Sequence, residues 1–169
     1  DRIRQDLTDI PQIVYGVNLG ITWKQFDLSL LFQGQAKVIN TIQETWVDPS
    51  SGGAGNLMQW WTEDMWTPEN TDGTKPRLGT PNKINGTTFT NINAAFFKLK
   101  NAEIGYTLPV AVREKIGVAN ARVYLSGTNL FSFDHMRGMG IDPEATGSGY
   151  GGWALNPQRL INLGVNVSF

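Results

Sequence analysis

The chain has 169 residues, with 14 Lys and Arg against 15 Asp and Glu, so its formal net charge is −1. A near-neutral chain lacks the basic surplus that general attraction to nucleic acid or to anionic membrane surfaces requires. Cysteine is absent, which excludes a disulfide scaffold and a thiolate metal site. Charged residues make up only 17% of the chain, and it contains 19 Gly and 6 Trp, a composition that favours strands and long loops over helices.

No apolar run approaches the ~20 residues that a membrane-spanning helix needs, so strands must make any membrane crossing. The chain begins with Asp1 and shows neither a start Met nor a signal-peptide pattern. We therefore expect it to be a segment of a longer protein.

The first two predicted strands, 13–23 and 26–36, form a hairpin around a two-residue turn at Lys24 and Gln25. Apolar side chains alternate with small or polar ones through both strands. Eleven residues at roughly 3.3 Å each give about 36 Å, and a ~45° tilt reduces this to ~25 Å, the height of the apolar band of an outer-membrane barrel.

Three further strands are predicted at 97–108, 121–131 and 160–169. In the first of them the apolar residues change phase near Lys100 and Asn101, which indicates a β-bulge. Pro109 ends that strand, and the connector that follows has room for a single helical turn. The last strand ends on the aromatic Phe169, as in the closing strand of an outer-membrane barrel.

The connections between the predicted strands alternate in length: two residues, roughly sixty, about twelve and nearly thirty. Short links therefore fall on one rim and long links on the other. Bacterial barrels keep short turns on the periplasmic side and long loops outside, so 37–95 and 132–158 are predicted to be extracellular loops. The fold class that this predicts is all-β, an antiparallel transmembrane β-barrel segment.

Several motifs occur in a fixed order along the chain. They are Trp66-Thr67-Pro68-Glu69-Asn70 with Pro76-Arg77-Leu78, Phe97-Lys98-Leu99-Lys100-Asn101 with Gly105-Tyr106-Thr107-Leu108-Pro109, Arg122-Val123-Tyr124 with Gly127-Thr128-Asn129-Leu130-Phe131, Asp142-Pro143-Glu144, and Gly164-Val165-Asn166-Val167-Ser168-Phe169. As an ordered set they resemble the carboxyl-terminal portion of the SusC/RagA family of TonB-dependent outer-membrane transporters. The resemblance covers the chain from about Tyr15 to its end.

The resemblance implies a large plugged barrel of about 22 strands in the bacterial outer membrane. It also implies import of glycans or peptides, energised through TonB and assisted by a SusD-like surface lipoprotein. The plug and the TonB-contacting segment have no counterpart among these residues, so residues 1–169 would supply part of the barrel wall and its outer loops. The implied partners are the rest of the barrel and plug, the lipoprotein, TonB through the missing part, and the lipid bilayer.

Alternation along the strands predicts which side chains face lipid. They are Tyr15, Val17, Leu19, Ile21, Trp23, Leu28, Leu30, Phe32, Leu163, Val165, Val167 and Phe169. The opposite side would face the lumen. Its polar members are Asn18, Thr22, Asp27, Gln33, Ser126 and Asn166.

Catalysis, a metal site and a cofactor are not indicated. His135 lies near Asp134, Asp142 and Glu144, a set more typical of a solvated loop than of a metal site. The glycine-rich stretches 51–55 and 147–152 lack the Lys and the strand-to-helix setting of a phosphate-binding loop. We therefore predict that the chain is not an enzyme and binds no cofactor.

Tryptophans in the long connections allow two interpretations. Residues 56–66 fit a short amphipathic helix in which Trp60 and Trp61 pack the loop, although both are also candidates for contact with a ligand or lid. Tyr150 and Trp153, set among glycines, are better candidates for such contact.

Two other functions remain open from the sequence. A secreted all-β carbohydrate-binding module would pack its apolar faces together and bind glycan through loop Trp residues. A passive structural barrel would share the strands but lack transport.

Overall fold

The computed structural model describes residues 6–42, 58–77, 88–144 and 156–169. Contacts divide the chain into two units. The sheet unit consists of residues 13–35, 96–133 and 157–169, and the loop unit of residues 1–12, 36–95 and 134–156.

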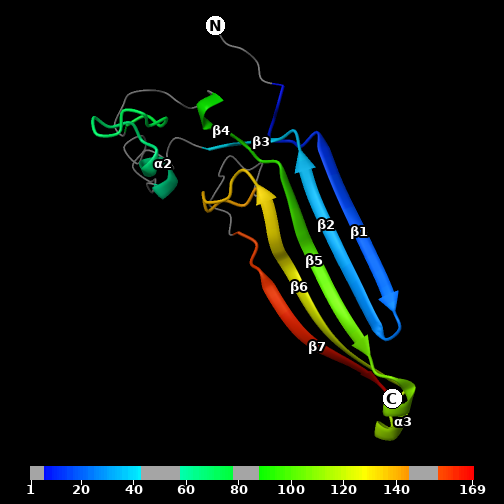
Figure 1. Ribbon diagram of the computed structural model, residues 1–169. Helices are drawn as coiled ribbons and strands as arrows, with labels where there is room; N and C mark the ends of the chain where they lie inside the picture. Colours follow the sequence, from blue (N-terminus) through cyan, green and yellow to red (C-terminus); the bar gives the residue numbers. More distant parts are fainter. Residues whose placement is uncertain (1–5, 43–57, 78–87, 145–155) are drawn as a thin grey trace. The chain divides into compact units, whose positions relative to one another are not determined.

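The sheet unit is a single five-stranded sheet in the order β1-β2-β5-β6-β7. Its strands alternate in direction, as Figure 1 shows. They are β1 (Ile13–Trp23), β2 (Phe26–Ala36), β5 (Phe96–Thr107), β6 (Asn120–Asp134) and β7 (Leu160–Ser168). A short helix, α3 (Val110–Ile116), connects β5 to β6. β1 and β2 have the ranges read from the alternation. Both ends of β5, the start of β6 and the end of β7 differ by one residue, and the end of β6 differs by three.

The β1–β2 turn lies at Lys24 and Gln25, and Lys24 takes the left-handed φ of 55° that tight hairpins require. The irregularity predicted in the third long strand is also present. Leu31 of β2 pairs with Asn101 of β5 while the next residue, Phe32, pairs with Leu99. Lys100 is therefore the extra residue of a β-bulge, and it restores the phase of the apolar side chains.

β6 continues three residues beyond the predicted end. Asn129 has a φ of 52°, a conformation that Asn tolerates better than most residues, and its side-chain amide donates to the carbonyl of Gln158 at 3.1 Å. This local irregularity explains why alternation weakens between Gly127 and Leu130 although the strand does not end there.

The loop unit has a small core of its own. Strands β3 (Ile39–Thr41) and β4 (Asn91–Asn93) pair antiparallel, and a single 3₁₀ turn, η2 (Thr88–Thr90), precedes β4. The buried residues of this core are Val38, Ile42, Trp61, Ala94, Met136 and Ile141. The sequence did not predict the β3–β4 pair, because three-residue strands are too short to show alternation.

The helix expected over 56–66 is shorter in the described residues, where α2 spans Gln59–Glu63. It ends at Asp64 because that residue and Trp66 pair with a later segment. The Lys75 N–H donates to the Asp64 carbonyl at 2.9 Å, and the Trp66 N–H donates to the Lys75 carbonyl at 2.7 Å. Within the part of the chain that the structure describes, no helix has the length and apolar composition to cross a membrane.

Candidate functional site

The sheet unit has two chemically different faces, and strand register defines them. Phe26, Leu28 and Leu30 of β2 pair with Tyr106, Ile104 and Ala102 of β5, and Phe32 pairs with Leu99 beyond the bulge. Val123 and Leu125 of β6 pair with Val165 and Leu163 of β7. Directly paired residues point to the same side of a sheet, so these residues form one surface, which we call the apolar face.

β1 joins the apolar face through Tyr15. Its ring lies over Gly34, where any side chain would overlap it, and its hydroxyl donates to the Phe96 carbonyl at 2.9 Å. The ring also stacks with Phe97 at 6.3 Å between centroids. Alternation then places Val17, Leu19, Ile21 and Trp23 on the same side.

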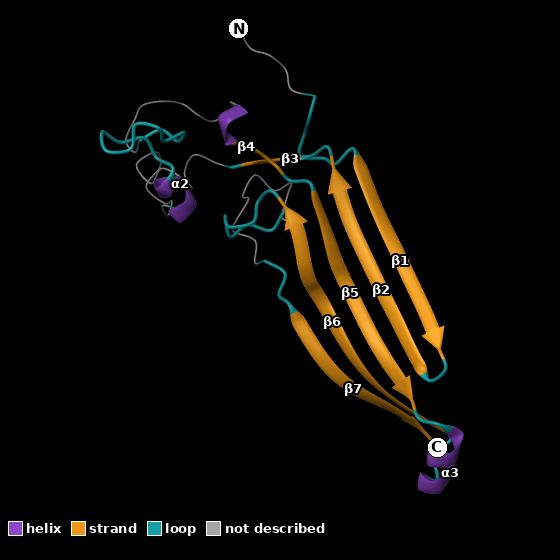
Figure 2. Cartoon of the chain, in the orientation of Figure 1, coloured by secondary structure: helices purple, strands orange, loops and turns teal. Residues whose placement is uncertain are grey.

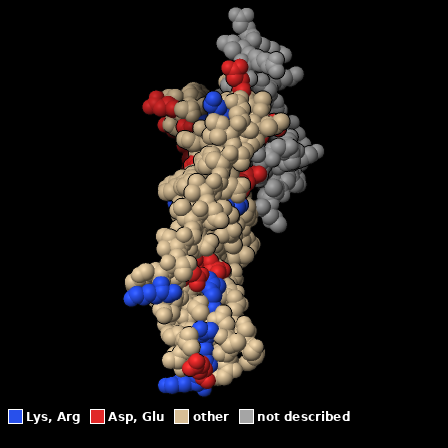
Figure 3. Space-filling model, turned by 90° about the vertical axis from the view of Figure 1, so that its right-hand side faces the viewer, with Lys and Arg blue, Asp and Glu red and all other residues tan. Residues whose placement is uncertain are grey.

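The residues predicted to face lipid differ in exposure according to their strand. Those on the edge strands β1 and β7 are exposed, for example Leu19 at 47% and Leu163 at 76%. Leu28, Leu30 and Phe32 are half-buried, because β2 has a neighbour on each side. Phe32 also stacks on Phe97 with ring centroids 5.3 Å apart. Figure 3 shows that much of the surface over the strands carries no Lys, Arg, Asp or Glu.

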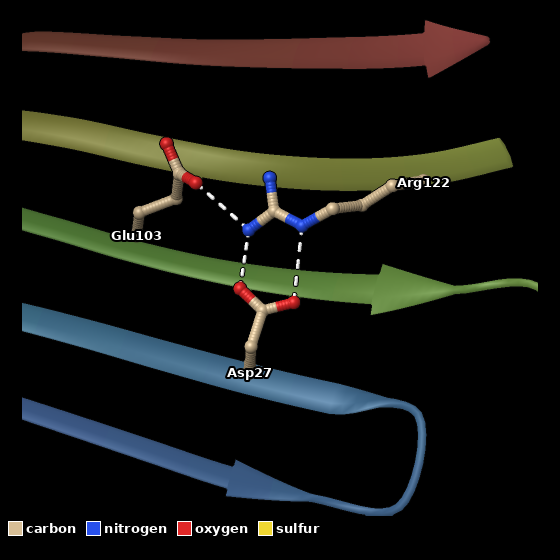
Figure 4. A network of polar contacts seen from close by, with 3 residues as sticks. All are labelled: Asp27, Glu103 and Arg122. Atoms are coloured by element: carbon tan, nitrogen blue, oxygen red, sulfur yellow. Dashed lines mark hydrogen bonds and ion pairs between the residues drawn. The ribbon is translucent and has the colours of Figure 1, made fainter. Parts of the chain in front are cut away.

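The other side of the sheet, which we call the polar face, carries an ion-pair network across three strands. Arg122 of β6 donates through Nε to Asp27 of β2 at 3.0 Å and through Nη2 to Glu103 of β5 at 2.8 Å. Its Nη2 also bonds the second Asp27 oxygen, which makes the Arg122–Asp27 pair bidentate. Figure 4 shows the Arg122 side chain extending from β6 toward β5, and Asp27 reaching toward it from β2.

A glycine makes this crossing feasible. Gly105 lies opposite Asp27 in the β2–β5 register, directly under the Arg122 guanidinium, and a Cβ there would overlap it. The same arrangement recurs one strand over, where Gly164 pairs with Tyr124 and leaves room for its ring. Arg122 lies 5.2 Å from the centroid of that Tyr124 ring.

The sequence did not predict this network. Register places Gln33, Ser126 and Asn166 on the polar face along with Asp27. The only sequence signal for the network was that Arg122, Asp27 and Glu103 all fall in polar positions of the alternation. Their proximity depends on the strand order, which alternation does not give.

The candidate contact residues in the loops are placed as follows. Trp61 is 3% exposed and belongs to the core of the loop unit, which supports packing rather than ligand contact for this residue. Trp60 is half-buried and lies edge-on to Trp61 at 5.6 Å. Tyr150 and Trp153 lie outside the described residues.

The segment after α2 contains one carboxylate with a shifted pKa. Thr74 donates to Asp64 through its hydroxyl and through its backbone N–H, the latter at 3.2 Å. These hydrogen bonds, with a smaller contribution from Lys75, hold the pKa of Asp64 below its ordinary value.

His135 and its acidic neighbours do not form a ligand cluster. In residues 6–42, 58–77, 88–144 and 156–169, no group of three or more His, Asp and Glu side chains is placed to hold a metal ion. Asp134 and Asp142 instead accept backbone hydrogen bonds, from Met136 at 3.0 Å and from Glu144 at 2.8 Å. These contacts are those of ordinary turns.

Comparison with known proteins identifies relatives of this two-faced sheet. The chain is 30% identical to TonB-dependent receptor P26 and 29% identical to TonB-dependent receptor P3, both of Formosa agariphila, over 95% and 94% of its length. The chain is homologous to TonB-dependent receptors. It spans 17% and 16% of these two curated relatives. No family model matches it.

Solved structures give the same result. The RagAB peptide importer in its open-open state matches 98% of this chain with a TM-score of 0.75 and 27% identity. The RagAB peptide transporter matches 99% of this chain with a TM-score of 0.76 and 28% identity. In each case the match covers 18% of the solved chain. The matches confirm the predicted resemblance to the SusC/RagA family and the fold class, a segment of an antiparallel barrel. The relatives are receptors and transporters, which agrees with the prediction that the chain is not an enzyme.

Proposed function

We propose that this chain forms part of the wall of a β-barrel in a bacterial outer membrane, with its apolar face toward lipid. The observation that supports this most strongly is the continuous apolar face, which runs across all five strands and stays exposed on β1 and β7. An apolar surface of this extent is unfavourable in water and is expected where lipid or another protein covers it. The polar face would then line the lumen.

The proposal extends to orientation. Both short links, the β1–β2 turn and the segment with α3, lie between strand ends at one end of the sheet (Figure 2). Bacterial barrels keep short turns in the periplasm, so this end would be periplasmic and the loops 37–95 and 132–158 extracellular.

The proposed activity of the whole protein is nutrient import. Two relatives are named TonB-dependent receptors, and the solved neighbours are described as a peptide importer. These names support TonB-driven uptake of peptides or glycans by the complete protein, with a SusD-like lipoprotein as its partner. The plug and the TonB contact would come from parts of the protein outside this chain.

The lipid assignment is tested by paired charge substitutions in the full-length receptor. Leu19→Arg and Val165→Arg place a charge on the apolar face, whereas Asn18→Arg and Asn166→Arg place it on the polar face one residue away. A charge near the bilayer midplane costs ~2–4 kcal/mol, so the first pair should lower the free energy of unfolding by that amount and the second pair should change it little. Equal losses on both faces would contradict the proposal.

The import assignment needs a separate measurement. Cells that make the full-length receptor should take up labelled peptide or glycan, and removal of TonB or of the partner lipoprotein should reduce uptake to the level of receptor-free cells. Uptake that is independent of TonB would instead support a passive barrel. Copurification of the receptor with a surface lipoprotein tests the proposed partner.

The proposed solute or lid contacts are the loop aromatics Tyr150, Trp153 and Trp60. Trp61 is not included, since it is buried. Replacing Trp153 with Ala should reduce uptake or lipoprotein binding while the unfolding transition of the barrel is unchanged. Trp61→Ala serves as the contrast, because it should destabilise the loop unit itself.

A secreted carbohydrate-binding module is the alternative from another class. It would need a second layer over the apolar face, as in a β-sandwich. The exposure of Leu163, Val165 and Val167 argues against such a layer. Expression of this segment as a detergent-free, glycan-binding monomer would support the module, and a requirement for detergent or for the rest of the receptor would support the barrel.

A further inference from the structure

The strand ends at the periplasmic side of the proposed barrel carry a surface that the import function does not use. We define the turn rim as the β1–β2 turn, the segment 108–119 and the end of β7. The Thr107 N–H donates to the Gln25 carbonyl at 2.8 Å, which joins the turn to the end of β5. The Ala119 N–H donates to the Ser168 carbonyl at 2.8 Å, which joins the segment after α3 to the end of β7.

Helix α3 has a well-defined C-terminal end within this rim. Pro109 precedes it, and Gly117 ends it in the left-handed conformation with a φ of 71°. The Val118 N–H donates to the Arg113 carbonyl at 3.1 Å, and the Arg113 guanidinium bonds the Ala119 carbonyl. These are capping contacts of the kind that fix a helix end, so α3 is a defined element despite its seven residues.

The exposed surface of α3 is largely apolar. Val112 and Ile116 are four residues apart, so they share one side of the helix, and they are 42% and 57% exposed. Val110 is also exposed, at 57%. In periplasmic water alone, these exposed apolar side chains would not stabilise the helix. At the membrane interface, a helix buries its apolar side at the headgroup boundary.

Cations of the rim accompany this apolar surface. Lys115 is next to Ile116 and exposed, and Arg113 is one turn before it. Lys24, in the neighbouring turn, places its ammonium 4.8 Å from the centroid of Trp23, which is 63% exposed. Against these three cations the rim has the single carboxylate side chain of Glu114. A basic, apolar and aromatic surface is complementary to an anionic phospholipid interface.

We propose that α3 is an interfacial helix that lies against the membrane beside the lipid-facing strands. Val112 and Ile116 insert at the headgroup boundary, and Lys115 and Lys24 contact lipid phosphates. The inference rests on the proposed membrane location of the apolar face. It assigns α3 to the bilayer and not to the plug or to another periplasmic protein.

Fluorescence quenching in liposomes tests the position of α3. The chain has no Cys, so a single cysteine can be introduced at Ile116 in the full-length receptor, with any cysteine elsewhere replaced, and labelled with a small fluorophore. The liposomes contain phospholipid with a spin-label quencher either near the headgroup or near the end of the acyl chain. Matched labels at Glu114, on the opposite side of α3, and at Asn162, on the polar face, report the background, and one at Leu163 reports the apolar face.

We expect the headgroup-proximal quencher to reduce Ile116→Cys fluorescence about twofold more than Glu114→Cys fluorescence, because an interfacial helix lies about 5–10 Å deep. Leu163→Cys should respond most to the deep quencher. If Leu163→Cys is quenched and Ile116→Cys only matches Asn162→Cys, the α3 proposal is overturned and the barrel assignment stands. If Leu163→Cys is not quenched, both fail.

The phosphate contact has its own test. Quenching of Ile116→Cys should be stronger in vesicles of phosphatidylcholine with phosphatidylglycerol than in phosphatidylcholine alone, and K115Q with K24Q should abolish the difference. A difference that persists in that double variant overturns the role of these lysines. Protection of Ile116→Cys from both lipid quenchers and aqueous iodide would identify a protein as the occupant and overturn the proposal.

Discussion

The guanidinium of Arg122 lies across Gly105, and this crossing allows one side chain of β6 to pair with Asp27 on β2. β5 lies between these two strands. The ion pair therefore passes over β5 at Gly105, which has no side chain to block it. Glu103 of β5 completes the network. The pairing thus depends on a residue without a side chain, and this dependence can be measured.

Gly105→Ala should destabilise the barrel because its methyl group displaces the guanidinium and breaks the bidentate pair. In an Arg122→Ala background the same substitution should be nearly neutral, because the three atoms nearest to the added methyl group all belong to the Arg122 side chain. A double-mutant cycle on denaturant unfolding of the full-length receptor should give a coupling of about 1 kcal/mol or more. Additive effects would show that the crossing does not stabilise the sheet.

Gly34→Ala makes a contrasting prediction. A methyl group there meets both the Tyr15 ring and the Phe96 carbonyl oxygen, the latter at 2.5 Å. Removing the ring with Tyr15→Ala should therefore fail to rescue Gly34→Ala, because the backbone oxygen remains. Tyr15→Phe, which removes only the hydrogen bond to Phe96, should cost about 1 kcal/mol in the same unfolding measurement. Full rescue by Tyr15→Ala would refute the backbone clash.

The bulge predicts a difference between two single-residue deletions in β5. Deleting Lys100 removes the extra residue of the β2–β5 pair and leaves every later side chain on its present face. Deleting Glu103 instead moves one end of β5 by one position and turns apolar side chains to the polar face. The yield of folded receptor in the membrane should be close to normal for the first deletion and low for the second. Similar yields would contradict the assigned register.

Asp64 provides a pH prediction in the loop unit. Hydrogen bonds from Thr74 lower its pKa in the folded loop, so their contribution is present above the unfolded pKa of about 3.9 and is lost as pH falls through the lower, folded value. Hydrogen exchange of residues 58–77, corrected for intrinsic rates, measures the protection of this segment. Protection should decline only at pH values below the pKa of an aspartate in an unfolded chain.

Thr74→Val is the control for this measurement, because it removes the hydroxyl donor and should move the loss of protection to higher pH. Asp64→Asn should remove the pH dependence. An unchanged profile in both variants would show that the Thr74–Asp64 contacts do not hold this segment together.

Alternation predicted the sheet well because each strand must present one chemistry on each side. It located β1 and β2, and the phase change at Lys100 indicated a bulge that the register contains. It failed at Asn129, where a left-handed residue interrupts the pattern without ending the strand. The β3–β4 pair has too few residues to show a period.

The apolar face of the candidate site could be predicted from the sequence, whereas the ion-pair network on the polar face could not. The apolar face follows from periodicity, which is local in sequence. The Arg122 network depends on strand order and register across residues 95 positions apart, and these are properties of the assembled sheet. The sequence allowed either packing or ligand contact for Trp61, and its burial in one core with Val38 and Met136 supports packing.

The central claim is that the apolar face contacts lipid, and site-directed spin labelling along β7 tests it most directly. Single cysteines from Leu160 to Ser168 in the full-length, membrane-reconstituted receptor would each carry a nitroxide, and collisions with lipid-soluble oxygen and with a water-soluble nickel chelate would be measured. We predict that oxygen accessibility peaks at Ile161, Leu163, Val165 and Val167 and that nickel accessibility peaks at the residues between them. A uniform profile, or oxygen maxima at Asn162 and Asn166, would contradict the account.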